Sequence, residues 1–171
     1  MVAAAVPVNA TAAALLGLLQ HGPATGGELV ALAAQHYGGV FGVTRSQVYR
    51  ELAALAEAGL LRLGKQGPRS SQAYLITAAG RRSFLRWLVA DPGGADGVRS
   101  PLLLRLMHAG ELTPAQRAQL VEQSGAELAQ QLQAARAVLR AAQDPYAAAA
   151  AEFAVAHIKA VARVVERVAA L

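Results

Sequence analysis

The chain has 171 residues, enough for one ordinary domain or two small ones, and a net charge of +5. Hydrophobic residues make up 54% but aromatic residues only 5%, a balance typical of an all-helical protein rather than of a membrane protein. The lack of cysteine excludes disulfides and thiolate metal sites, and no signal peptide is expected, so the sequence predicts a cytoplasmic protein.

The positive charge is confined to the first half of the sequence. Residues 1–90 hold eight Arg or Lys side chains against three Glu, a net of +5, whereas residues 91–171 hold eight of each sign. A basic half beside a neutral half indicates that the first half binds a polyanion and that the second has another task.

Two helices are predicted before residue 40. The first covers residues 10–20 and is stopped by the sequence HGP, and the second covers residues 25–36. In the second helix Thr25 is followed three positions later by Glu28, which is the spacing of a capping box.

A third helix is predicted to begin at Thr44 and to end at Gly59. An apolar row at helical spacing, Val48 to Leu52 to Leu55, predicts its core face. The polar residues gather instead in its first two turns: Thr44, Arg45, Ser46, Gln47, Tyr49 and Arg50. A helix that only packs has no need of this asymmetry, whereas a helix whose front end enters a groove does.

Two short strands follow, one around Leu61 and Leu63 and one around Tyr74 and Ile76. The sequence GKQGPRSS between them is a basic hairpin connection that contains Lys65 and Arg69. Thr77 and Gly80 then mark the turn into a helix with three apolar residues expected on its buried side, namely Phe84, Leu85 and Leu88.

Residues 91–100, DPGGADGVRS, are the best linker candidate, so the predicted domains are residues 1–90 and residues 98–171. The second domain begins with a short apolar helix. A long helix then opens at Thr113-Pro114, and a final helix covers about residues 146–170. The final helix aligns Phe153, His157, Ala160, Val161, Val164 and Val168. A small domain cannot bury the apolar rows of two such long helices alone, so a second copy of the chain is expected to cover them.

The predicted fold is therefore mainly α: an N-terminal winged helix-turn-helix of three helices and a two-stranded β-wing, then a C-terminal helical dimerisation domain. A recognition helix presents only its first turns to base edges in the major groove of double-stranded DNA. We expect Ser46, Gln47 and Arg50 to discriminate bases, with Thr44 capping the helix, Arg45 reaching a phosphate and Tyr49 contacting phosphate or the wing. Lys65 and Arg69 on the wing would contact the DNA backbone.

The first half of the chain resembles the PadR family of bacterial transcriptional regulators over about residues 12–88. The resemblance rests on GLL followed by HGP at residues 17–23, on EAGL at residues 57–60, and on single positions that include Gly26, Tyr49, Arg69, Tyr74, Thr77 and Gly80. It implies a homodimer on a palindromic operator, usually a repressor. The family typically has a tyrosine where this chain has Gly27.

Other interpretations compete at single positions and for the whole chain. Trp87 is a candidate contact for a small-molecule effector or for the dimer partner. The four histidines have no partner at metal-binding spacing, no cofactor motif is present, and no nucleophile motif indicates an enzyme. The alternative function is a protein-interaction or scaffold module, because a winged helix does not by itself fix function.

Overall fold

The computed structural model describes residues 8–38, 40–66, 72–90 and 100–171. The chain divides into two compact units, Met1–Gly93 and Gly94–Leu171, each of which is described by itself. The predicted linker lies, apart from Ser100, outside the described residues, so the limits of the two predicted domains stay a prediction.

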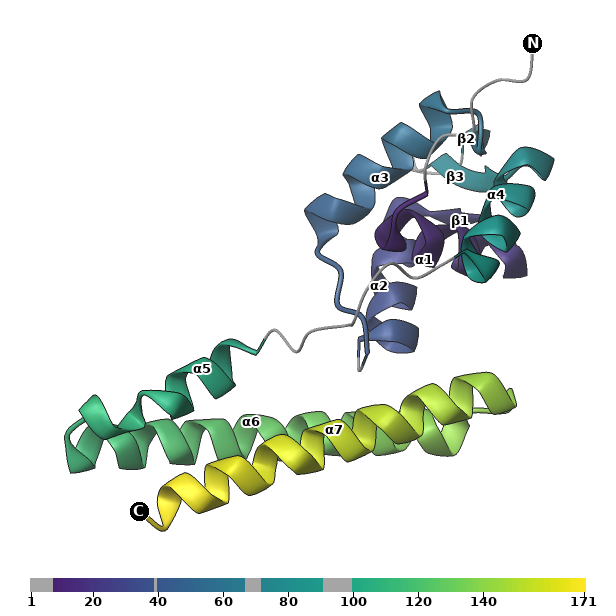
Figure 1. Cartoon of the computed structure of the whole chain (residues 1–171). Helices are drawn as coiled ribbons and strands as arrows, with labels where there is room; N and C mark the ends of the chain where they lie inside the picture. Colours follow the sequence, from purple (N-terminus) through teal and green to yellow (C-terminus); the bar gives the residue numbers. More distant parts are fainter. Residues whose placement is uncertain (1–7, 39, 67–71, 91–99) are drawn as a thin grey trace. The chain divides into compact units, whose positions relative to one another are not determined.

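The described residues of the N-terminal unit form four helices and a small sheet (Figure 1). In chain order its elements are α1 (Ala10–Leu18), a 3₁₀ turn η1 (Leu19–His21), β1 (Ala24–Thr25), α2 (Gly26–Tyr37), α3 (Arg45–Glu57), β2 (Leu61–Gln66), β3 (Gln72–Ile76) and α4 (Ala78–Val89). Three helices followed by a strand pair and a further helix confirm the predicted winged helix-turn-helix.

The sheet contains one strand more than predicted among the described residues. Its order is β1-β3-β2, and both pairs are antiparallel, with Ala24 opposite Tyr74 and Leu61 opposite Ile76. The strand β1 has only two residues, too few for any alternating pattern, and it exists because β3 offers it a partner. It joins the start of α2 to the wing.

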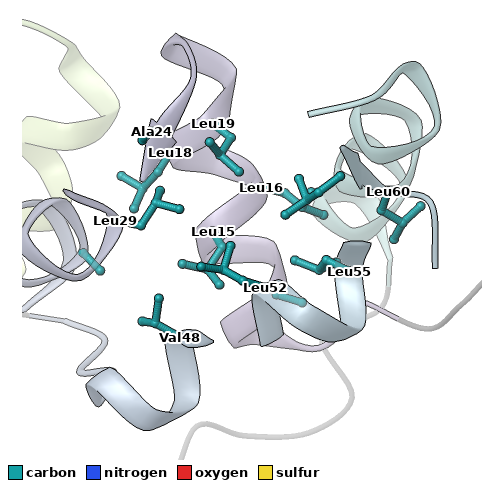
Figure 2. Close-up of a cluster of buried hydrophobic side chains, with 13 residues drawn as sticks. Leu15, Leu16, Leu18, Leu19, Ala24, Leu29, Val48, Leu52, Leu55 and Leu60 are labelled. Carbon is teal, nitrogen blue, oxygen red and sulfur yellow. The ribbon is translucent and has the colours of Figure 1, made fainter. Parts of the chain in front are cut away.

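The core of this unit is a cluster of buried aliphatic side chains contributed by all three of the first helices (Figure 2). The predicted core face of α3 is confirmed, since Val48 and Leu52 are fully buried and Leu55 is 4% exposed. They meet Leu15 from α1 and Leu29 from α2, both fully buried. Burying such a side chain stabilises the fold by about 1.5–3 kcal/mol, so these three residues attach one face of α3 to the core.

The buried side of α4 differs from the prediction. Phe84 packs against the core as expected, but Leu85 and Leu88 are 61% and 54% exposed in this unit. The buried positions are instead Gly80 and Ser83. A Cβ on Gly80 would collide with the backbone carbonyl oxygen of Leu60, so the helix is seated on its smallest residues rather than on its largest apolar ones.

The C-terminal unit consists of α5 (Pro101–Met107), a 3₁₀ turn η3 (Ala109–Glu111), α6 (Pro114–Ala141) and α7 (Pro145–Ala169). The helix α6 starts as predicted with the cap Thr113 and an N1 proline, Pro114. The helix α7 starts in the same way at Asp144-Pro145, one residue before the predicted start at about residue 146. The two long helices pack side by side (Figure 1), with α5 against α7.

The packing face of α7 is offset from the predicted row. The buried residues are Ala151, Ala154, Ile158, Val161 and Val165, which share only Val161 with the prediction. Phe153 and Val164 are instead 61% and 38% exposed in this unit. The row that packs on α6 combines two alanines, which allow a close approach, with three β-branched residues, and it leaves a second apolar row on the flank.

None of the helices in the described part of the chain is long and apolar enough to cross a membrane.

Candidate nucleic-acid interface

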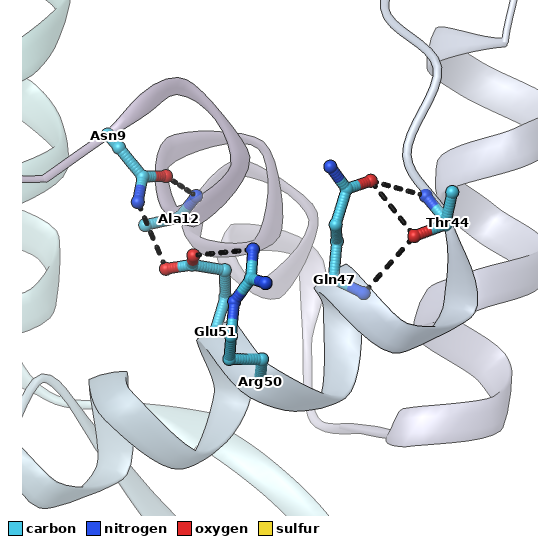
Figure 3. A network of polar contacts seen from close by, with 6 residues as sticks. All are labelled: Asn9, Ala12, Thr44, Gln47, Arg50 and Glu51. Carbon is cyan, nitrogen blue, oxygen red and sulfur yellow. Dashed lines mark hydrogen bonds and ion pairs between the residues drawn. The ribbon is translucent and has the colours of Figure 1, made fainter.

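The start of α3 is held by the predicted capping box. The Thr44 side chain accepts a hydrogen bond from the Gln47 backbone N–H at 3.3 Å, while Gln47 Oε1 accepts from the Thr44 backbone N–H at 2.8 Å and from its hydroxyl at 3.0 Å (Figure 3). These bonds satisfy backbone donors that a helix otherwise leaves open. The amide oxygen of Gln47 is therefore occupied by the cap, whereas its amide nitrogen takes no part in these bonds.

The end of α3 is closed as tightly as its start. Gly59 adopts a φ of +70°, its N–H donates to the Ala56 carbonyl, and the Leu60 N–H donates to the Leu55 carbonyl. This is the Schellman arrangement, which favours glycine because other residues are strained at positive φ. Both ends of α3 are therefore capped by hydrogen bonds, and one of its faces is buried in the core.

The residues at the start of α3 that are predicted to contact DNA lie on the solvent side of the helix. Thr44, Arg45, Ser46, Tyr49 and Arg50 are exposed, and Gln47 is half-buried. The next outward positions, Ala53 and Ala54, are also exposed and carry only a methyl group. The structure thus brings these six polar residues together on one helix start, beside a stretch with little steric bulk.

Arg45 and Tyr49 interact one helical turn apart. The guanidinium carbon of Arg45 lies 5.6 Å from the centroid of the Tyr49 ring, within cation–π range. The ring lies close to the first residue of α2, because a Cβ on Gly26 would be 2.6 Å from Tyr49 Cε1 and 2.9 Å from Cζ. The contacts of α3 therefore extend to α2 through Gly26.

Arg50 belongs to a network that links α3 to the start of α1 (Figure 3). Its Nη2 lies 3.9 Å from Glu51 Oε1, and the Arg50 side chain is 71% exposed against 14% for Glu51. Asn9 Nδ2 donates to Glu51 Oε2 at 3.1 Å, while Asn9 Oδ1 caps α1 by accepting from the Ala12 N–H at 2.8 Å. Asn9 was not expected at this site, although an asparagine directly before an apolar helix is a recognisable N-cap signal.

The start of α2 carries the second predicted capping box. Glu28 Oε2 accepts from the Thr25 backbone N–H at 2.7 Å and from its hydroxyl at 2.9 Å. The hydrogen bond from the Thr25 backbone, followed by that from its side chain, lowers the pKa of Glu28 below its ordinary value of 4.5. The two capping boxes differ in one respect: the box of α2 can be titrated and that of α3 cannot.

The wing is described only in part. Lys65 lies in β2, and Arg69 lies outside the described residues, so the structure does not bear on the predicted contacts of Arg69. Trp87 lies in α4 with 38% of its surface exposed, near the exposed Leu88 and Val89. Within the described residues, no three His, Asp or Glu side chains gather as a metal site requires.

The sequence and the fold both match known proteins. Residues 15–86 match the family described as the transcriptional regulator PadR-like family. A search of curated proteins gave no match to this sequence.

Three solved structures illustrate the similarity in fold. Bacillus subtilis PadR in complex with operator DNA is 19% identical, with a TM-score of 0.76 over 96% of this chain and 99% of that one. The Streptococcus mutans protein smu.1604c is 19% identical, with a TM-score of 0.81 over 94% and 98%. The Vibrio cholerae virulence activator AphA is 23% identical, with a TM-score of 0.68 over 94% and 96%. At these identities the likeness establishes the fold of both units.

Proposed function

This chain belongs to the PadR-like family of transcriptional regulators, matched over residues 15–86, and we propose that it is a sequence-specific DNA-binding repressor that acts as a homodimer on a palindromic operator. Members of this family are regulators and not enzymes, in agreement with the sequence prediction.

The observation that carries this proposal is the division of α3 into a buried stem and an exposed polar front. Val48, Leu52 and Leu55 fix one face of the helix in the core, so the polar side chains of its first two turns project from the other face without being needed for packing. In this proposal Arg50 and Ser46 read base edges, assisted by the Gln47 amide nitrogen. Thr44 positions the helix, and phosphates are contacted by Arg45, Tyr49, Lys65 and Arg69. Arginine at a helix start is well suited to guanine, because its fork matches two acceptors on that base.

The homodimer is supported by apolar surface on the C-terminal unit. On α7, Phe153 and Val164 lie on one flank, and on α5 Leu104 and Met107 are 58% and 79% exposed. Large apolar side chains left exposed on a small helical unit are consistent with an interface. Two copies related by a two-fold axis would present two α3 helices to half-sites about one helical turn apart.

The test is an equilibrium titration of the full chain against double-stranded DNA from upstream of its own gene, at two salt concentrations. Binding is expected to weaken steeply with salt, with log K falling by about 0.9 per neutralised phosphate for each unit of log salt. Arg50→Ala should weaken binding by about 1–3 kcal/mol. The exposed Arg140 of the C-terminal unit provides a matched control, and Arg140→Ala should bind as the wild type does.

The same titration separates the proposed function from a scaffold role. A scaffold would bind the fragment weakly, without a salt-dependent shift, and Arg50→Ala would change nothing. The half of the chain that contains α3 and the wing carries a net charge of +5. A scaffold does not need this concentration of positive charge, so the charge distribution favours DNA binding.

The direction of regulation is a separate part of the proposal, since one structure of similar fold is that of an activator. A reporter driven by the upstream region should rise when the gene is deleted in the host; a fall would mean activation. Such a regulator acts in the cytoplasm, where the chromosome lies. Trp87 is proposed as a contact for an effector or for the partner chain, and its fluorescence reports either event.

A further inference from the structure

The contact between Gly26 and Tyr49 joins the two helices of the helix-turn-helix at the surface rather than in the core. Gly26 is the first residue of α2 and is buried, and the Tyr49 ring lies over it while keeping 41% of its own surface exposed. A Cβ on Gly26 would lie 2.6 Å from Tyr49 Cε1 and 2.9 Å from Cζ, closer than such atoms approach, so the ring would have to move. The ring occupies this place only because residue 26 has no side chain.

The Tyr49 ring also contacts a charged side chain, that of Arg45. The Arg45 guanidinium carbon lies 5.6 Å from the centroid of the same ring. A free arginine at a helix start samples many rotamers and loses that freedom on binding, whereas one held over an aromatic ring is already ordered. A ring that is itself fixed against α2 orders the guanidinium better than a ring free to turn.

We propose that Gly26 and Tyr49 are positioning residues of the DNA interface: the bare backbone at Gly26 seats the Tyr49 ring, and the ring orients the Arg45 guanidinium toward a DNA phosphate. This inference rests on the proposed DNA-binding function, which it deepens. It assigns to α2 a part in DNA affinity that does not require α2 to touch DNA.

The chain supplies its own control in the next residue. Gly27 is also in the first turn of α2, and a Cβ placed on it would meet nothing within 4 Å. Gly26→Ala and Gly27→Ala therefore add the same methyl group and a similar gain in helix propensity one position apart. Only Gly26→Ala displaces the Tyr49 ring.

The experiment measures affinity and salt dependence of the full chain for a double-stranded DNA fragment that the wild type enriches from a random-sequence pool. Gly26→Ala should lower affinity by about two- to tenfold, the size of a weak cation–π contact and an oriented phosphate contact. The slope of log K against log salt should move toward that of Arg45→Ala, by up to about one unit. Gly27→Ala should match the wild type in both respects.

A second background distinguishes positioning from a purely structural effect. When Tyr49 is replaced by Ala, adding Gly26→Ala should lower affinity no further, because the ring it displaces is absent. Equal affinities for Gly26→Ala and Gly27→Ala, or an undiminished effect of Gly26→Ala beside Tyr49→Ala, would overturn the proposal.

The second link is tested without changing either glycine. Arg45→Ala and Tyr49→Ala should be non-additive in affinity, and strict additivity would overturn the proposal even if Gly26→Ala failed to fold. A wild-type chain that enriches no DNA fragment would instead contradict the proposed function itself, so the two failures are distinguishable.

Discussion

At the scale of single residues, the proposed DNA interface includes groups that hold its side chains in place as well as the side chains expected to contact DNA. Glu51 is the clearest example, because it is 14% exposed, accepts from Asn9 and lies 3.9 Å from Arg50. A carboxylate on a DNA-facing helix repels phosphate, so its presence needs a compensating task. Here it ties α3 to the first turn of α1 and sits beside the arginine proposed to read a base.

Replacing Glu51 by Ala should therefore lower the stability of the N-terminal unit, by about 0.5–1.5 kcal/mol for the lost hydrogen bond. Urea unfolding of the full chain, followed by circular dichroism, measures this. Glu57→Ala is the matched control, since Glu57 is an exposed residue in the last turn of the same helix. Equal midpoints for both variants would show that the link to Asn9 contributes nothing to stability.

At the scale of helices and strands, the parts that local sequence decides were predictable. The capping pairs Thr25 with Glu28 and Thr44 with Gln47 form as predicted, since a cap involves residues three apart. Features that depend on tertiary contacts could not be predicted. The strand β1 depends on β3, and the seat of α4 depends on how near Gly80 lies to the Leu60 carbonyl. The Gly26–Tyr49 contact likewise joins two helices and leaves no mark in either sequence segment.

The difference between the two capping boxes predicts that the stability contributed by Glu28 depends on pH. The pKa of Glu28 is lowered in the folded state, so its contribution to stability is present above its ordinary value of 4.5 and is lost as the pH falls through the lower folded value. Glu28→Gln places at α2 the residue type, glutamine, that closes the capping box of α3. Thermal unfolding from pH 7 to pH 3 should show the wild type losing its advantage over Glu28→Gln as the pH falls below about 4.5. A difference in melting temperature independent of pH would contradict this.

At the scale of the whole molecule, the two units nearly coincide with the net positive half and the neutral half of the sequence. The positions of the long helices could be predicted, because the cap and proline at Thr113-Pro114 and the break at Asp144-Pro145 are local signals. The inward face of α7 could not be, since it depends on which row packs more closely on α6. Because the row from Ala151 to Val165 packs inward, Phe153 and Val164 stay exposed, where a second chain could cover them.

Phe153→Glu should therefore convert the proposed dimer to a monomer, because a charge would be buried without a partner in an apolar interface. Light scattering after size-exclusion chromatography measures the mass directly. Lys159→Glu introduces the same residue at an exposed position on a different side of α7 and should remain dimeric. A dimer that survives Phe153→Glu would place the interface elsewhere.

The most direct test of the central claim, that the exposed front of α3 reads DNA as one half of a symmetric pair, is selection of bound sequences from a random double-stranded pool. The wild type should enrich a palindromic motif, with half-site centres about one helical turn apart. Arg50→Ala should enrich the same motif with one position lost from each half-site. A motif unchanged by Arg50→Ala, or no enriched motif at all, would contradict the account.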